Sequence, residues 1–218
     1  MNETKKLASC SLLVALATVL AAVSMVLPLR LPFGGSVTLA SCLPIIAAGY
    51  LYGVRSGLWS GAVFAVIQMF LGGATVSAFF MPGDAQMVWW RAVLVCVIDY
   101  LLAYTALGLG GIFRRRIKST AAALCLGSIV ALTVKYLFHV ISGAVFFGAY
   151  AEWFFTDVAG GTLGESVLAH LSGAPLAVVY SAVYNGLYMI PEIILTAVVA
   201  VATSGIVKRY KQNHEGKA

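Results

Sequence analysis

The chain has 218 residues, of which 61% are hydrophobic and only 10% are charged. Soluble domains carry about a quarter charged residues, so this composition excludes an ordinary soluble protein. The formal net charge is +6, but the basic residues fall in short clusters between apolar runs. We therefore attribute the charge to membrane topology and expect no nucleic-acid partner.

Apolar runs of about 20 residues recur along the chain, and each can cross a hydrocarbon core about 30 Å thick. They predict an all-α integral membrane protein with one domain, 1–218, whose six helices span residues 7–28, 37–53, 55–73, 88–113, 119–148 and 177–207. The second span contains Pro44 and is expected to be kinked. The long loop 149–176 is expected to hold a short interfacial helix near Leu163–Leu171.

The placement of lysine and arginine predicts the orientation of these spans. Loops on the cytoplasmic side carry the excess of basic residues. A cytoplasmic N-terminus places eleven of the 14 basic residues inside, all except Arg30, Arg91 and Lys135. The opposite loops instead carry acidic residues, among them Asp84 and Asp157. Both termini are therefore expected in the cytoplasm.

Four ionisable residues fall within the last three predicted spans. A charge inside a membrane is energetically costly, so such residues are usually paired with one another or have a function. The four are Asp99, Lys135, His139 and Glu192. With His139 neutral, this set carries a net charge of about −1, which suits a small aromatic cation held by a carboxylate and by aromatic faces. The alternative is that Lys135 forms a structural ion pair with Glu192 or Asp99 that holds helices together.

The helical spacing places these residues beside further polar side chains. Lys135 and His139 are four residues apart and share one helix face. Tyr180, Tyr184 and Tyr188 repeat this spacing in the last span, next to Asn185. The polar groups of the last three spans are therefore candidates for one binding site.

Motifs for catalysis are absent from the sequence. It contains no GxxxxGK[ST], HExxH or GxSxG pattern, and its four cysteines form no CxxC pair. We expect no ATPase activity in this chain, no cofactor and no metal site. The protein is accordingly expected not to be an enzyme.

Small residues recur at four-residue spacing in the first span. The pairs are Ser11/Ala15, Ala17/Ala21 and Thr18/Ala22. Small side chains let two membrane helices approach closely, so these pairs are candidate contacts for another helix.

Three segments of the last three spans resemble the thiamine-specific S component (ThiT family) of energy-coupling factor (ECF) transporters. The segments are DYLLA at 99–103, KYLFHVISGAVFFGAY at 135–150 and YSAVYNGLYMIPE at 180–192. The resemblance covers most of the chain, and its motifs are most specific in these helices. It departs from some members of the family at Asp99, where they carry glutamate, and at Phe147, where they carry tryptophan.

The resemblance implies a multi-pass protein of the bacterial cell membrane that captures thiamine from outside. It implies partners that import the vitamin: one transmembrane T component and two ATPase subunits. Asp99 would face the cationic ligand, and His139, Tyr180 and Asn185 would bind its aminopyrimidine. Further pocket positions would be Lys135, Tyr100, Gly143 and Phe147. The partner module would meet the first helix at Ala17 and Ala21.

Other functions remain open at this point. The chain could be an S component for another vitamin, a thiamine phosphate or a thiamine precursor. It could also be a proton-coupled secondary carrier that uses Asp99, His139 and Glu192 as a relay. A membrane enzyme is the third alternative.

Overall fold

The computed structural model describes residues 3–26 and 35–215. Within these ranges, five apolar helical segments are long enough to cross a membrane. They are α1 (Glu3–Ser24), α3 (Val54–Leu71), the segment Trp89–Gly111, α7 (Thr120–Phe146) and α10 (Gly173–Glu215). The prediction of an all-α membrane protein is confirmed. The end of the first predicted span, at 27 and 28, lies outside the described residues.

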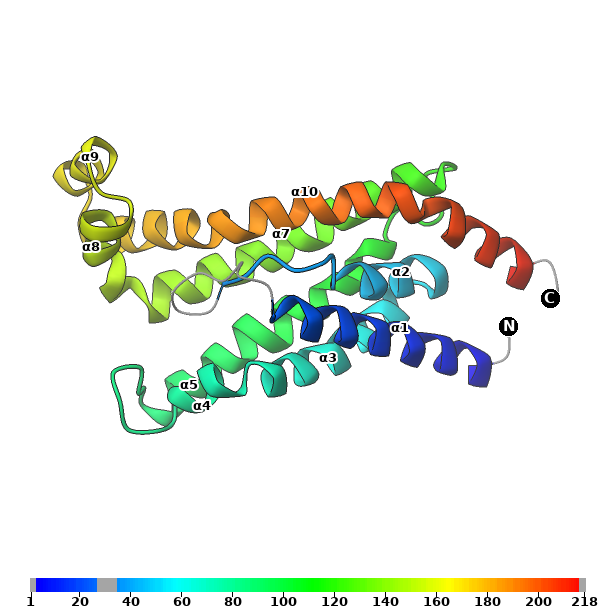
Figure 1. Ribbon diagram of the computed structural model, residues 1–218, viewed down its shortest axis with the longest axis horizontal. Coiled ribbons are helices and arrows are strands. Elements are labelled where there is room, and N and C mark those ends of the chain that lie inside the picture. The colour runs from blue at the N-terminus through cyan, green and yellow to red at the C-terminus, as the bar shows by residue number, and fades with distance from the viewer. Residues whose placement is uncertain (1–2, 27–34, 216–218) are drawn as a thin grey trace.

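The start of α1 and the end of α10 lie at the same end of the bundle (Figure 1). Within the described residues, the five long segments and the shorter α2 (Leu43–Tyr52) make six passes, and an even number of passes brings both ends of the chain to one side. The cytoplasmic location of that end stays a prediction.

The second predicted span is only partly helical. Residues 37–42 are not helical, and α2 (Leu43–Tyr52) has 10 residues, which corresponds to about 15 Å. Pro44 lies in the first turn of α2, where its missing N–H group is not needed. The proline therefore begins the helix instead of kinking it, which corrects our expectation. Non-helical backbone is tolerated at membrane depth when protein surrounds it, and Ala40, Ser41 and Cys42 are all buried.

The segment Trp89–Gly111 changes its helical type along its length. It consists of α5 (Trp89–Val95), the π-helix η2 (Cys96–Leu102), α6 (Ala103–Thr105) and the 3₁₀-helix η3 (Ala106–Gly111). Asp99 lies in the π-helical turn. Wide turns of this kind frequently occur at functional sites.

Short helices cover the end of the bundle opposite the termini (Figure 1). They are α4 (Gly73–Ala78), η4 (Gly148–Tyr150), α8 (Ala151–Trp153), η5 (Phe154–Val158) and α9 (Thr162–His170). The last of these confirms that the loop after α7 contains a helix. Phe154 and Phe155 of η5 are 1% exposed and pack with Tyr180 of α10. An aromatic cluster therefore holds η4, α8, η5 and α9 on the ends of α7 and α10.

The half of the bundle nearer the termini is packed backbone against backbone. A Cβ atom on Gly57 of α3 would lie 2.6 Å from the Cα of Gly49 and 2.8 Å from the Cα of Gly108. Such distances are too short for any side chain, so only glycine allows α2, α3 and η3 to meet here. Phe64 of α3 and Leu132 of α7 are fully buried in the same core cluster.

The packing of α1 corrects one sequence-based choice. Ala17 and Ala21 are 0% and 5% exposed and belong to the same core as Ile45 of α2 and Phe64 of α3. These two side chains face this chain's own helices, so they are not a surface on which a partner could dock. The neighbouring small pair, Ser11 and Ala15, is exposed.

Candidate functional site

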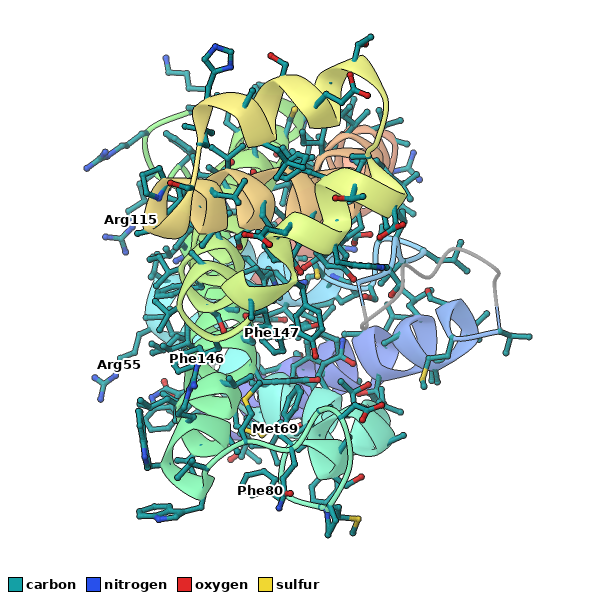
Figure 2. The ribbon with its side chains drawn as sticks, turned by 90° about the vertical axis from the view of Figure 1, so that its left-hand side faces the viewer. Arg55, Met69, Phe80, Arg115, Phe146 and Phe147 are labelled. Atoms are coloured by element: carbon teal, nitrogen blue, oxygen red, sulfur yellow. The ribbon has the colours of Figure 1, made fainter. Side chains whose placement is uncertain are left out.

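A cavity of about 310 Å³ lies in the half of the bundle away from the termini. One part of its wall comes from the end of α1, the non-helical residues before α2, the end of α3 and the helix α4. The other part comes from the π-helical turn, α7 and α10. All eight residues predicted to bind a ligand line it: Asp99, Tyr100, Lys135, His139, Gly143, Phe147, Tyr180 and Asn185. Figure 2 views the molecule from the side of α8 and α9; Phe147 lies near the middle, and Arg55 and Arg115 point outward at the edge. Whether the eight contact a ligand stays a prediction.

Asp99 is held by two donors from α7. Its Oδ1 atom lies 2.9 Å from Nδ1 of His139, and its Oδ2 atom accepts a 2.7 Å hydrogen bond from the Ser142 hydroxyl. An ionised carboxylate only accepts, so opposite such a carboxylate the Nδ1 atom of His139 would carry the proton and donate the hydrogen bond. This bond fixes the imidazole ring and leaves Nε2 for another partner. The carboxylate is thus oriented toward α7 at the cavity wall.

Asn185 joins α10 to α7 through its side-chain amide. Its Nδ2 atom donates to the carbonyl oxygens of Ser181, at 2.8 Å, and of His139, at 3.3 Å. Its Oδ1 atom accepts a 2.6 Å bond from the Tyr188 hydroxyl. The donors of Asn185 are therefore largely used within the protein, whereas Oδ1 retains a second lone pair for a ligand.

Lys135 is buried, and its ammonium group lies against an aromatic ring. Its Nζ atom is 4.2 Å from the ring centroid of Tyr104 and 3.9 Å from the sulfur of Cys42. Within the described residues, neither Glu192 nor Asp99 forms an ion pair with it. The alternative of a direct structural ion pair at Lys135 is therefore wrong, and a cation–π contact takes its place.

Aromatic side chains form the outer part of the cavity. Phe147 packs against Phe79 with ring centroids 5.9 Å apart, and Tyr180 packs against Phe154 at 5.4 Å. Tyr100 stacks on Tyr104 at 6.4 Å. Such faces suit a flat or cationic ligand.

Sequence reasoning missed several residues of the site. Thr38, Tyr104 and Phe79 line the cavity, and Ser142 orients Asp99. Two of them carried a usable signal, since Tyr104 is four residues from Tyr100 and Ser142 three residues from His139, each on a face already singled out. Thr38 and Phe79 lie in loops or at helix ends, where spacing gives no such indication.

A carboxylate, an imidazole and aromatic walls around one cavity of an apolar bundle are the features of a small-molecule site in a membrane protein. The family described as Thiamine transporter protein (Thia_YuaJ) matches residues 7–153. The chain belongs to this family, as the sequence resemblance indicated.

Individual relatives agree with this assignment. The thiamine transporter ThiT of Bacillus subtilis (strain 168) is 28% identical over 211 residues, which cover 91% of each chain. ThiT of Lacticaseibacillus paracasei is 27% identical over 119 residues, or 50% of this chain and 53% of the relative. A solved structure of ThiT from Listeria monocytogenes superposes with a TM-score of 0.65, covering 96% of this chain and 98% of the other. Its sequence identity is 19%, so that likeness concerns the fold.

Proposed function

We propose that this chain binds thiamine from outside a bacterial cell, as the S component of an ECF transporter. The observation that carries the proposal is the placement of Asp99 and His139 on one cavity with Tyr180, Asn185 and Phe147. The relatives in Bacillus subtilis and Lacticaseibacillus paracasei are thiamine transporters.

The chemistry of thiamine matches this set of groups. The vitamin has a thiazolium ring with a fixed positive charge and a flat, neutral aminopyrimidine ring. A desolvated carboxylate at Asp99 would offset the charge, and aromatic rings would cover both faces. The edge of the pyrimidine needs hydrogen-bond partners, which Nε2 of His139 and Oδ1 of Asn185 can supply. The volume of about 310 Å³ is at the lower end of small-molecule sites, roughly 300–1,000 Å³, and suits a ligand of two small rings.

Two measurements on the purified protein test the ligand. Native mass spectrometry is expected to show one co-purifying thiamine per chain. After its removal, titration with thiamine should change the fluorescence of the four tryptophans and saturate. Tighter binding of another vitamin or of a thiamine phosphate than of thiamine would overturn the assignment.

Energy for import would come from partner subunits, a T component and two ATPases, because the sequence offers no nucleotide-binding loop. The exposed pair Ser11 and Ala15 on α1 is the surface we propose for the T component. Small side chains there would let a helix of the partner approach closely.

Replacing Ala15 by tryptophan tests this surface. We expect thiamine binding by the purified variant to be unchanged, because Ala15 is exposed and lies outside the cavity. Uptake of labelled thiamine in cells should fall at least about tenfold, since a bulky ring prevents close helix contact. Leu137→Trp, at a side chain 51% exposed on α7, is the matched control. Full uptake by Ala15→Trp would exclude α1 as the docking surface.

A further inference from the structure

The inner arm of the first loop, which we define as residues 35–42, is fastened to the middle of α10. The amide of Thr38 donates to Oε2 of Glu192 at 2.6 Å, and the hydroxyl of Thr38 donates to Oε1 at 2.7 Å. Glu192 is 1% exposed. One buried carboxylate therefore binds the backbone and the side chain of the same loop residue.

The inner arm is also bound to α1. The amide of Leu39 donates to the hydroxyl of Ser24 on α1 at 2.8 Å. Within the arm itself, the hydroxyl of Ser41 donates to Oγ1 of Thr38 at 2.9 Å. Between them, Ala40 has a φ of 53°, in the left-handed region that residues other than glycine rarely adopt. Such a conformation persists only where its surroundings hold it.

The two oxygens of Glu192 are used by the inner arm and not by a direct ion pair with Lys135. The ammonium group of Lys135 lies over Tyr104 instead, at 4.2 Å from the ring centroid. A buried carboxylate is unfavourable unless hydrogen bonds and nearby positive charge compensate it. Lys135 lines the same cavity as Glu192. The two hydrogen bonds from Thr38 compensate the buried carboxylate of Glu192 directly.

The fastened arm forms part of the cavity wall. Gly35, Ser36 and Thr38 line the cavity, as does Glu192 itself. Movement of this arm away from α10 would open this part of the cavity wall. The position of the arm is therefore set by the carboxylate of a helix that also carries Tyr180 and Asn185.

We propose that Glu192 is a positioning residue, which holds the inner arm through Thr38 as a wall of the cavity and slows the departure of the ligand. The proposal rests on the proposed binding of thiamine. Glu192 acts through Thr38 in this scheme, and it does not serve as the counter-charge of the ligand.

Stopped-flow measurement of thiamine dissociation tests the proposal with two variants. Glu192→Gln leaves one acceptor where there were two, and Thr38→Val removes the donating hydroxyl at similar volume. Each is expected to raise the dissociation rate by about tenfold, the effect of losing one hydrogen bond to a charged group. The double variant should be no faster than the faster single variant, because both changes break the same contact.

Two controls separate positioning from direct contact. Thr38→Ser keeps the hydroxyl and should restore the wild-type dissociation rate. Thr196→Val removes another hydroxyl, 3.5 Å from Oε1 of Glu192, but on α10 itself, and should leave the rate unchanged. If Glu192 instead contacted the ligand directly, Glu192→Gln would accelerate dissociation and Thr38→Val would not, which would overturn the proposal.

Hydrogen exchange in ligand-free protein gives a readout that is independent of thiamine. Amides of residues 35–41 should exchange faster in Glu192→Gln and Thr38→Val than in wild type, and Thr196→Val should match wild type. Unchanged exchange in both variants would overturn the positioning role even if the wild-type protein binds thiamine. A wild-type protein that binds no thiamine would instead overturn the proposed function.

Discussion

Replacing Asp99 by asparagine is expected to weaken thiamine binding at least about tenfold, or about 1.4 kcal/mol. The substitution keeps the shape of the side chain and one oxygen that can accept from Ser142 or His139. It removes the negative charge that would attract the thiazolium in a site screened from water. Titration of tryptophan fluorescence measures the change.

The controls for Asp99→Asn show whether the affinity depends on a charge in the cavity or on the overall charge of the protein. Asp157 lies exposed in η5 at the same end of the molecule, and Asp157→Asn should leave the affinity nearly unchanged. Ser142→Ala removes one donor to the carboxylate but keeps the charge, so its effect should be smaller than that of Asp99→Asn. The neutral aminopyrimidine half of thiamine, used alone as a ligand, should lose little affinity on Asp99→Asn. Equal affinity of Asp99→Asn and wild type for thiamine would exclude Asp99 as the counter-charge.

Gly143→Ala should lower both the thermal stability and the affinity for thiamine. A Cβ atom at this position would overlap Oγ of Ser181 and come within 3.2 Å of Nδ2 of Asn185. The extra methyl group would therefore push α7 away from α10 at the cavity wall. Overpacking of this kind costs about 1–3 kcal/mol, so the melting temperature in detergent should fall measurably.

Two further variants show whether this steric contact is the cause. Adding Ser181→Ala to Gly143→Ala removes Oγ and leaves the Ser181 Cβ atom at 3.1 Å, so part of the lost stability should return. Gly205→Ala, also on a long helix, meets nothing within 4 Å and should be neutral or stabilising by up to about 1 kcal/mol. A melting temperature for Gly143→Ala equal to that of wild type would contradict the close approach of the two helices.

The fold was largely predictable because hydrocarbon thickness and apolar runs constrain membrane helices strongly. The boundaries were less predictable, since a helix need not end where the membrane does. We predicted the last span at 177–207, whereas α10 runs over Gly173–Glu215. The last span was predicted too short, whereas the second was predicted too long, at 37–53 against Leu43–Tyr52 for α2. Pro44 is compatible with the start of a helix as well as with a kink. Composition alone does not distinguish these two uses of proline.

The candidate site was predictable where a residue is unusual in a membrane. Buried ionisable residues such as Asp99 and Lys135 are conspicuous there, and the structure places them on one cavity with the other predicted residues. A hydroxyl such as Thr38 is ordinary in any loop, so nothing in the sequence marked it as the partner of Glu192. The faces of α1 show a third limit. Small-residue spacing identified candidate contact faces but not which one points inward, and Ala17 and Ala21 lie on the inner one.

The glycine contact between α2, α3 and η3 has a consequence for the cell's electrical balance. A protein that holds charged groups such as Lys135 and Asp99 in a cavity within the membrane could carry a leak of protons or ions. Gly57 touches Gly49 and Gly108 too closely for a file of water to pass between them, and Phe64, seven residues further along α3, is fully buried. The contact therefore leaves no route for protons or ions between α2, α3 and η3.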